Sequence, residues 1–295
     1  MKKILPILLV FLCLSVTPVF ADTISHHAFD ECSDTSLADS VGSHDATAVN
    51  TSWNMEGVSG CAIDFDGSVS SGYVMIPNDT AYVFGTGEFA ISLWHKVIVD
   101  EGEYILSMND GNWYWDDWLV IDSACGSHKY QTSFGNSSDT VGYCVNSNYS
   151  TEWQHILFQR DETGNVSTYI NGVLENSTID TVPYDLNLTH NIYIGGVPTD
   201  DFGYISGSVD EVWFFDDALI EEEIFNIYTY NSLTVPAEEP TEMQTMLAQI
   251  GDGLGSFLNA IGGSLANLLL TVGAVMGIAS MFYAIAYSIK SSLSR

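Results

Sequence analysis

The chain has 295 residues, with 38 acidic side chains against seven basic ones and a formal net charge of −31 at pH 7. Nucleic-acid binding depends on Lys and Arg that neutralise phosphates, so this charge balance excludes that function. An acidic surface suits calcium binding, a salty medium or plain solubility, and composition does not choose among the three.

The first 21 residues predict a signal peptide. Lys2 and Lys3 form a basic start, residues 4–16 are apolar, and the segment ends at Ala21 in a suitable cleavage site. Cleavage before Asp22 is therefore expected, and an uncleaved N-terminal anchor is the alternative. The chain that remains is predicted to be exported.

Four cysteines remain after this cleavage, namely Cys32, Cys61, Cys125 and Cys144. An even number of cysteines in an exported chain predicts disulfides. Three pairings are possible. The pairs Cys32–Cys61 and Cys125–Cys144 are favoured because each could join neighbouring strands. The chain has no C-x-x-C motif, which argues against a zinc or redox site.

Seven N-x-[ST] triplets are candidate glycosylation sites and are expected to mark exposed loops. Chance occurrence in a chain rich in Asn, Ser and Thr is the alternative reading. The acceptor residues would be Asn50, Asn78, Asn136, Asn148, Asn165, Asn176 and Asn187.

Residues 22–230 predict one all-β domain, an antiparallel sandwich or barrel. Short runs rich in Val, Ile, Thr, Tyr, Phe and Trp alternate with turn signals. The runs are 73–76, 89–99, 118–121, 153–159, 166–170, 191–194 and 209–215. Asn171-Gly172 predicts a tight hairpin turn. Both faces of 89–94 are mostly apolar, so this strand is expected to be covered on both sides.

A single short helical pattern spans residues 218–227. Its spacing predicts that Leu219, Ile220, Ile224 and Ile227 face inward, while Glu221–Glu223 face outward.

Five blocks of sequence, in order, carry a family resemblance. They are Phe29–Glu31 with 39–47, Gly60–Gly67 with Tyr73-Val74, Phe89–Trp94, Trp153–Ile156 through Gly172, and Gly207–Val212 through Ile224. Together these blocks resemble laminin G-like domains of the concanavalin A-like lectin/glucanase family. The resemblance implies a jelly-roll sandwich of two curved antiparallel sheets.

The resemblance also implies a structural calcium ion where the first and last strands meet, with Asp210 as the matching acid. Asp210 stands in an otherwise apolar strand pattern, where a carboxylate needs a partner. Oxygen atoms near Asp30 or Asp66 could complete the calcium shell. The alternative is that Asp210 caps a turn or accepts backbone N–H bonds.

The segment 109–118 (NDGNWYWDDW) is a candidate carbohydrate site. Aromatic rings can stack on a sugar and carboxylates can accept its hydroxyl hydrogens. The candidate residues are Trp113, Trp115, Asp116, Asp117 and Trp118. The alternative is that these aromatic side chains belong to the core of the domain.

The sequence argues against an enzyme. Related glucanases use two Glu residues on one strand, in an E-x-D-x-x-E or E-x-D-x-E motif, and neither motif occurs. Glu101–Glu103 and Glu221–Glu223 have the wrong spacing or setting. His95 and His155 lie within strand patterns and are expected to be structural.

The C-terminal part predicts a membrane anchor. A linker (231–241) precedes an amphipathic juxtamembrane helix (242–261), a transmembrane helix (262–289) and a cytoplasmic tail (290–295). No charged residue occurs from Gly253 to Ile289. A buried core helix is the alternative. Gly273 and Gly277 form a G-x-x-x-G pair that could support homo-oligomerisation.

These patterns together predict a membrane-anchored, surface-displayed lectin-like domain, without enzymatic activity, that binds a glycan or a surface protein. The alternative functions are a structural envelope or spike component and, less well supported, a glycoside hydrolase.

Overall fold

The computed structural model describes residues 21–67, 72–99, 104–109, 118–122, 125, 129–135, 140–180, 184–198 and 203–234. The chain divides into two compact units, Met1–Val235 and Pro236–Arg295. All the described residues belong to the first unit.

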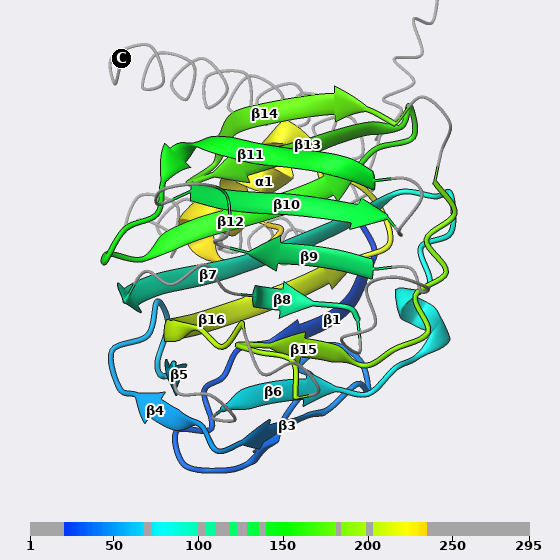
Figure 1. Cartoon of the computed structure of the whole chain (residues 1–295). Helices are drawn as coiled ribbons and strands as arrows, with labels where there is room; N and C mark the ends of the chain where they lie inside the picture. Colours follow the sequence, from blue (N-terminus) through cyan, green and yellow to red (C-terminus); the bar gives the residue numbers. More distant parts are fainter. Residues whose placement is uncertain are drawn as a thin grey trace, which may run out of the picture. The chain divides into compact units, whose positions relative to one another are not determined.

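The described residues form two antiparallel sheets of eight strands each, so the predicted two-sheet sandwich is confirmed. Figure 1 shows the two sheets as stacked layers. The first sheet, sheet A, has the order β14-β13-β12-β7-β16-β5-β4, with β1 also paired to β16. Its strands are β1 (Thr23–His27), β4 (Ser52–Asn54), β5 (Ala62–Asp66), β7 (Phe89–Val99), β12 (Gln154–Arg160), β13 (Asn165–Ile170), β14 (Val173–Ile179) and β16 (Ser206–Phe215).

The second sheet, sheet B, has the order β11-β10-β9-β8-β15-β6-β3-β2. Its strands are β2 (Ser36–Leu37), β3 (Ala46–Val49), β6 (Tyr73–Ile76), β8 (Tyr104–Ser107), β9 (Trp118–Asp122), β10 (Lys129–Gly135), β11 (Thr140–Asn148) and β15 (Ile192–Ile194). The 3₁₀ helix η1 (Thr80–Tyr82) precedes β7, and the helix α1 (Glu221–Tyr230) follows β16.

Strand β7 is covered on both sides, as its sequence predicts. Phe89, Ile91 and Leu93 belong to the main core between the sheets. Ala90 faces the other way and belongs to a second, smaller apolar cluster. That cluster joins the outer face of sheet A to α1, which lies behind the sheet in Figure 1. Its members include Leu157 and Phe215 from the strands, Leu219 from the loop before α1, and Ile224 and Ile227 from the helix.

Helix α1 differs from its predicted orientation at two residues. Leu219, Ile224 and Ile227 are buried as predicted, but Ile220 is 58% exposed. The sequence predicts that Glu223 faces outward, but this side chain is only 2% exposed. Its Oε2 accepts the Ile220 N–H (2.9 Å) and its Oε1 accepts the Ala21 N–H (2.8 Å). The carboxylate therefore caps the helix and also binds the backbone of Ala21, the last residue of the predicted signal peptide. A hydrophobic pattern reveals neither contact.

Both predicted disulfides are confirmed. Cys32 pairs with Cys61, and Cys125 pairs with Cys144, each with a Cα–Cα distance of 5.6 Å. The predicted hairpin is also confirmed. Asn171 and Gly172 have positive φ angles of 52° and 73°, and Ile170 pairs with Val173 across the turn.

The candidate glycosylation sites do not all lie in exposed loops. Asn50, Asn78, Asn148 and Asn187 are exposed. Asn165 and Asn176 are half-buried within β13 and β14, and Asn148 is the last residue of β11, so the prediction of an exposed loop is wrong for these three. Asn136 lies outside the described residues.

Several predictions about the ends of the chain fall on residues that the structure does not describe. They are the signal sequence before Ala21, the linker after Thr234, the helices at 242–261 and 262–289, the tail 290–295, and the pair Gly273 and Gly277. Within the described ranges, no helix is long and apolar enough to cross a membrane.

Candidate functional site: a cavity at the end of helix α1

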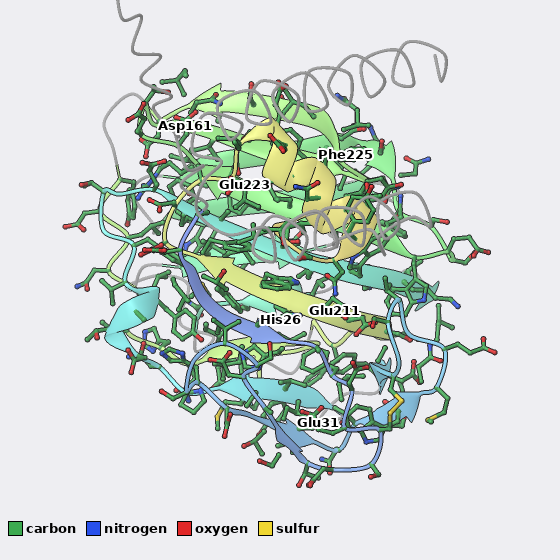
Figure 2. All side chains as sticks on the ribbon, turned by 180° about the vertical axis from the view of Figure 1, so that it is seen from behind. His26, Glu31, Asp161, Glu211, Glu223 and Phe225 are labelled. Carbon is green, nitrogen blue, oxygen red and sulfur yellow. A yellow bond between two sulfur atoms is a disulfide. The ribbon has the colours of Figure 1, made fainter. Side chains whose placement is uncertain are left out.

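A cavity of about 340 Å³ opens on the outer side of sheet A, at the C-terminal end of α1. Three separate parts of the chain form its walls: strand β7, the turn between β4 and β5, and the last turn of α1. Figure 2 looks onto the face of the domain that carries this helix. The lining residues are Val58, Ser59, Trp94, Tyr228, Thr229, Tyr230 and Asn231. We call this site the helix-end cavity.

Aromatic packing sets the position of the two large rings in the helix-end cavity. The rings of Trp94 and Tyr228 are stacked, with 5.7 Å between centroids and 23° between planes. The ring of His155 lies 5.2 Å from Trp94, and His155 Nε2 makes a 2.7 Å hydrogen bond with Ser92 Oγ. His155 is fully buried, which lowers its pKa to about 3. It is therefore a neutral support for Trp94, in line with its predicted structural role.

The turn that carries Val58 and Ser59 is held in place by Asp210. Strand β16 pairs with β5 up to Val209, and β1 takes over from Val212. At this change of partner, the Asp210 carboxylate accepts the N–H groups of Val58 (2.7 Å) and Ser59 (3.3 Å). The turn approaches so closely that a Cβ on Gly57 would lie 2.8 Å from Asp210 Oδ2.

Burial governs the charge state of Asp210, whose side chain is inaccessible to solvent. Burial, followed by the charge of Glu211, raises its pKa to about 8, although the N–H donors of Val58, Ser59 and Glu211 oppose the shift. The carboxyl group therefore takes up a proton near neutral pH. It supports the cavity wall without adding a permanent charge beneath it.

The opposite wall is the C-terminus of α1. Asn231 ends the helix in the left-handed conformation (φ 50°), and its N–H donates to the Ile227 carbonyl (3.0 Å). The Asn231 Oδ1 accepts the indole N–H of Trp213 at 3.1 Å. An Asn in this backbone conformation is a common helix end. It fixes Tyr228, Thr229 and Tyr230 at the rim of the cavity.

The lining indicates what the helix-end cavity can bind. Aromatic rings stand beside hydroxyl and amide side chains, and none of the described lining residues carries a formal charge. Rings offer apolar contact to the faces of a small molecule, while hydroxyl and amide groups hydrogen-bond to its polar edges. The arrangement suits an uncharged molecule with many hydroxyl groups.

The residues predicted to hold calcium do not all converge. Asp30 Oδ1 accepts the Cys61 N–H (3.1 Å), so Asp30 and Asp210 hold the same turn. Asp66 lies at the other end of β5, opposite Ser206. No group of three or more His, Cys, Asp or Glu among the described residues is placed to hold a metal ion. The backbone N–H bonds match the alternative role of Asp210, and calcium binding stays a prediction.

Most of the predicted sugar-binding segment cannot be placed. Trp113, Trp115, Asp116 and Asp117 lie outside the described residues. Trp118 begins β9, is half-buried and pairs with Gly135 of β10. The role of this segment therefore stays a prediction.

Sequence reasoning did not identify the helix-end cavity. The helical pattern ends at Ile227, before the lining residues Tyr228–Asn231, and Trp94 was expected only to lie on a covered strand. Asn231 is the residue that could have indicated a longer helix, because Asn commonly follows the last turn of a helix. No local sequence pattern indicates the cavity, because Ser59, Trp94 and Tyr228 are far apart along the chain.

Several solved structures share the fold. The binding domain of Paraclostridial Mosquitocidal Protein 1 is 11% identical, with a TM-score of 0.58 over 71% of this chain and 52% of that one. Domain 4 of AbnA, a GH43 extracellular arabinanase from Geobacillus stearothermophilus solved with arabinotriose, is 17% identical. Its TM-score is 0.55, over 72% of this chain and all of that domain.

A botulinum neurotoxin type C structure, from work on cell entry that depends on two ganglioside molecules, is 18% identical. Its TM-score is 0.55, over 72% of this chain and 51% of that one. This chain thus spans about half the length of the two toxin structures. At such low identities the likeness concerns the fold alone.

Comparison with curated proteins found no match. Residues 66–225 match the sequence profile Laminin_G_3, which describes the concanavalin A-like lectin/glucanases superfamily. This segment is more than half of the 295-residue chain. The chain therefore belongs to the concanavalin A-like lectin/glucanases superfamily.

Proposed function

We propose that this protein is a carbohydrate-binding domain displayed at a membrane surface, and that the helix-end cavity holds an uncharged sugar. The observation that carries the proposal is the lining of the cavity, where stacked Trp94 and Tyr228 stand beside hydroxyl and amide groups without a charged side chain. The superfamily and the neighbours solved with arabinotriose or linked to gangliosides support the class of ligand.

The charge of the domain favours a neutral sugar over an acidic one. Between Asp22 and Thr234 only Lys96, Lys129 and Arg160 are basic. Arg160 is fully buried, so its guanidinium is not accessible to a ligand. A sialylated or sulfated glycan would approach a strongly acidic surface with few cations to pair with.

The membrane-bound form of the proposal rests on the sequence. The signal peptide, the linker and the apolar segment 262–289 would export the domain and hold it on a single span. Attachment of several copies to one surface would raise the avidity of weak sugar binding. A surface protein as the ligand remains the alternative partner.

A glycan array probed with the full-length protein in mild detergent tests the proposal. We expect neutral oligosaccharides to bind, and Tyr228→Leu to weaken the binding at least tenfold by calorimetry, because it removes the ring stacked on Trp94. The matched control is Phe225→Leu, since Phe225 is on the same helix, is 56% exposed and does not line the cavity.

Three outcomes have different meanings. Loss of binding in Trp113→Leu and Trp115→Leu, with Tyr228→Leu unaffected, would move the site to the segment predicted from the sequence. Equal losses in Tyr228→Leu and Phe225→Leu would remove the cavity as the site. A full array without any bound glycan would overturn carbohydrate binding and favour a structural role in a coat or envelope.

A further inference from the structure

Three side chains outside the helix-end cavity form a continuous hydrogen-bonded chain. Ser40 Oγ lies 2.7 Å from His26 Nδ1, and His26 Nε2 lies 2.5 Å from Glu211 Oε2. Ser40 follows β2, His26 is in β1 and Glu211 is in β16, so the fold brings together residues that are far apart in sequence. Figure 2 labels His26 and Glu211 on their neighbouring strands.

Hydrogen bonds fix the backbone around Ser40 and His26. The Ser40 N–H donates to the His26 carbonyl (2.9 Å), and the His26 N–H donates to Asp39 Oδ1 (3.0 Å). Asp39 also accepts the N–H groups of Val41 and His44. Burial raises the pKa of Asp39, but these backbone donors and that of Gly42 lower it well below its usual value. The stable carboxylate fixes the loop, so Ser40 and His26 are held in register without a ligand.

The histidine ring and its acid are equally well positioned. The His26 ring stacks on Trp213, with 3.6 Å between centroids and 13° between planes. Glu211 is buried and has a positive φ of 51°, at the point where β16 changes partner. A non-glycine residue in this conformation is strained and persists where its surroundings demand it. In this conformation the Glu211 carboxylate lies within hydrogen-bond distance of His26 Nε2.

Hydrogen-bonding chemistry sets the roles of the two ring nitrogens. A carboxylate only accepts, so His26 Nε2 carries the proton that is donated to Glu211. In the neutral ring, Nδ1 then holds a lone pair and accepts the Ser40 hydroxyl proton. Ser40 itself is exposed, so a small molecule can reach its Oγ. A serine beside a histidine base that is oriented by a buried acid is the arrangement of an activated nucleophile.

We propose that Ser40, His26 and Glu211 form a second functional site, which hydrolyses small carboxylic esters. Ser40 is the nucleophile, His26 is the general base and then the general acid, and Glu211 orients the ring. This activity is independent of glycan binding and differs from glucanase chemistry, which uses two carboxyl groups on a glycosidic bond.

The reaction balances with water as the second substrate. Ser40 Oγ bonds to the acyl carbon as its proton moves to His26 Nδ1. The ester C–O bond then breaks, and the alcohol leaves with that proton. Water adds to the acyl-serine, its proton passes to His26 Nδ1, and Ser40 Oγ recovers the proton when the carboxylic acid leaves. The net change is ester plus water to acid plus alcohol, with Ser40 and His26 restored.

The full-length protein should be treated with a fluorophosphonate probe, which modifies activated serines, and the labelled peptide mapped by mass spectrometry. We expect one adduct on Ser40 and measurable hydrolysis of p-nitrophenyl acetate. Ser40→Ala and His26→Ala should each lose the adduct and reduce hydrolysis at least tenfold. Glu211→Gln should weaken both and lower kcat with little change in KM, because the ring loses the charged partner that orients it.

The matched control is Ser43→Ala. Ser43 is an exposed serine in the same loop. This variant should keep the adduct and the hydrolysis. An unlabelled wild-type protein, or an adduct that persists in Ser40→Ala, would overturn the proposal. Because Ser40 and Ser43 are both at the surface, this comparison stands even if Glu211→Gln fails to fold. Glycan binding that survives in Ser40→Ala would separate this site from the helix-end cavity.

Discussion

Arg160 shows how a single buried cation can organise one end of the sandwich. Its guanidinium donates to the carbonyls of Gly85 (2.6 Å), Gly87 (2.8 Å) and Tyr184 (2.8 Å) and lies 3.5 Å from Asp180. Burial lowers its pKa, while Asp180 opposes that shift. The arginine is always charged in proteins, so this network replaces its lost hydration. One of the few positive charges of the domain is thus spent on holding loops together.

Asp210 makes stability depend on pH in a direction that can be measured. Its pKa is about 8 in the folded protein, raised first by burial, against about 4 in an unfolded chain. The protonated Asp210 carboxyl group therefore makes its full contribution to the free energy of unfolding below about pH 4. This contribution is lost as the pH rises through about 8. Asp210→Asn cannot ionise. The free energy of unfolding in urea, measured from pH 4 to pH 9, should therefore decline less for this variant than for the wild type. Parallel plots of this free energy against pH for the two proteins would contradict the expectation.

At the scale of elements, strands were easier to predict than the residues that end them. The runs at 73–76 and 89–99 match β6 and β7 at both ends, because alternating apolar residues report burial directly. The run at 209–215 begins three residues too late, since Gly207 and Ser208 have weak strand preferences. The helical pattern at 218–227 begins and ends three residues before α1. Its last turn is fixed by the Asn231 cap and not by an apolar spacing.

The turn of the β13–β14 hairpin packs against Tyr228, which lines the helix-end cavity. Gly172 has a φ of 73°, and a Cβ there would lie 3.0 Å from Tyr228 Cδ1. Gly85 has a φ of 56°, and its nearest contact would be 3.6 Å away. Gly172→Ala and Gly85→Ala should each lose about 1–2 kcal/mol of unfolding free energy from backbone strain. Only Gly172→Ala should also move Tyr228 and alter native tryptophan fluorescence. The same fluorescence change in Gly85→Ala would contradict this.

At the scale of the whole molecule, the sequence identified the fold and the covalent links but neither of the two proposed sites. Composition and periodicity predict an antiparallel sandwich or barrel, the family resemblance implies the two sheets, and the even number of cysteines predicts the disulfides. The helix-end cavity and the Ser40–His26–Glu211 chain depend on contacts between distant segments, such as Ser59 with Asp210 and His26 with Glu211. No short-range pattern encodes such contacts.

Export and anchoring can be tested on the whole chain. The full-length product should stay with membranes after alkaline carbonate extraction, because an apolar span of 262–289 would remain in the lipid. A fragment that ends at residue 241 should instead be secreted with both disulfides formed. Release of the full-length product by carbonate would refute the anchor, and retention of the shorter fragment in the cytoplasm would refute the signal peptide.

The short segment of β16 where the neighbouring strand changes from β5 to β1 has an evolutionary consequence. Asp210 supports the wall of the helix-end cavity, and the next residue, Glu211, orients His26. Trp213 stacks on His26 and also donates to Asn231 at the cavity rim. A substitution in this short segment would disturb both places at once, so descendants of this protein could not readily diversify one while conserving the other.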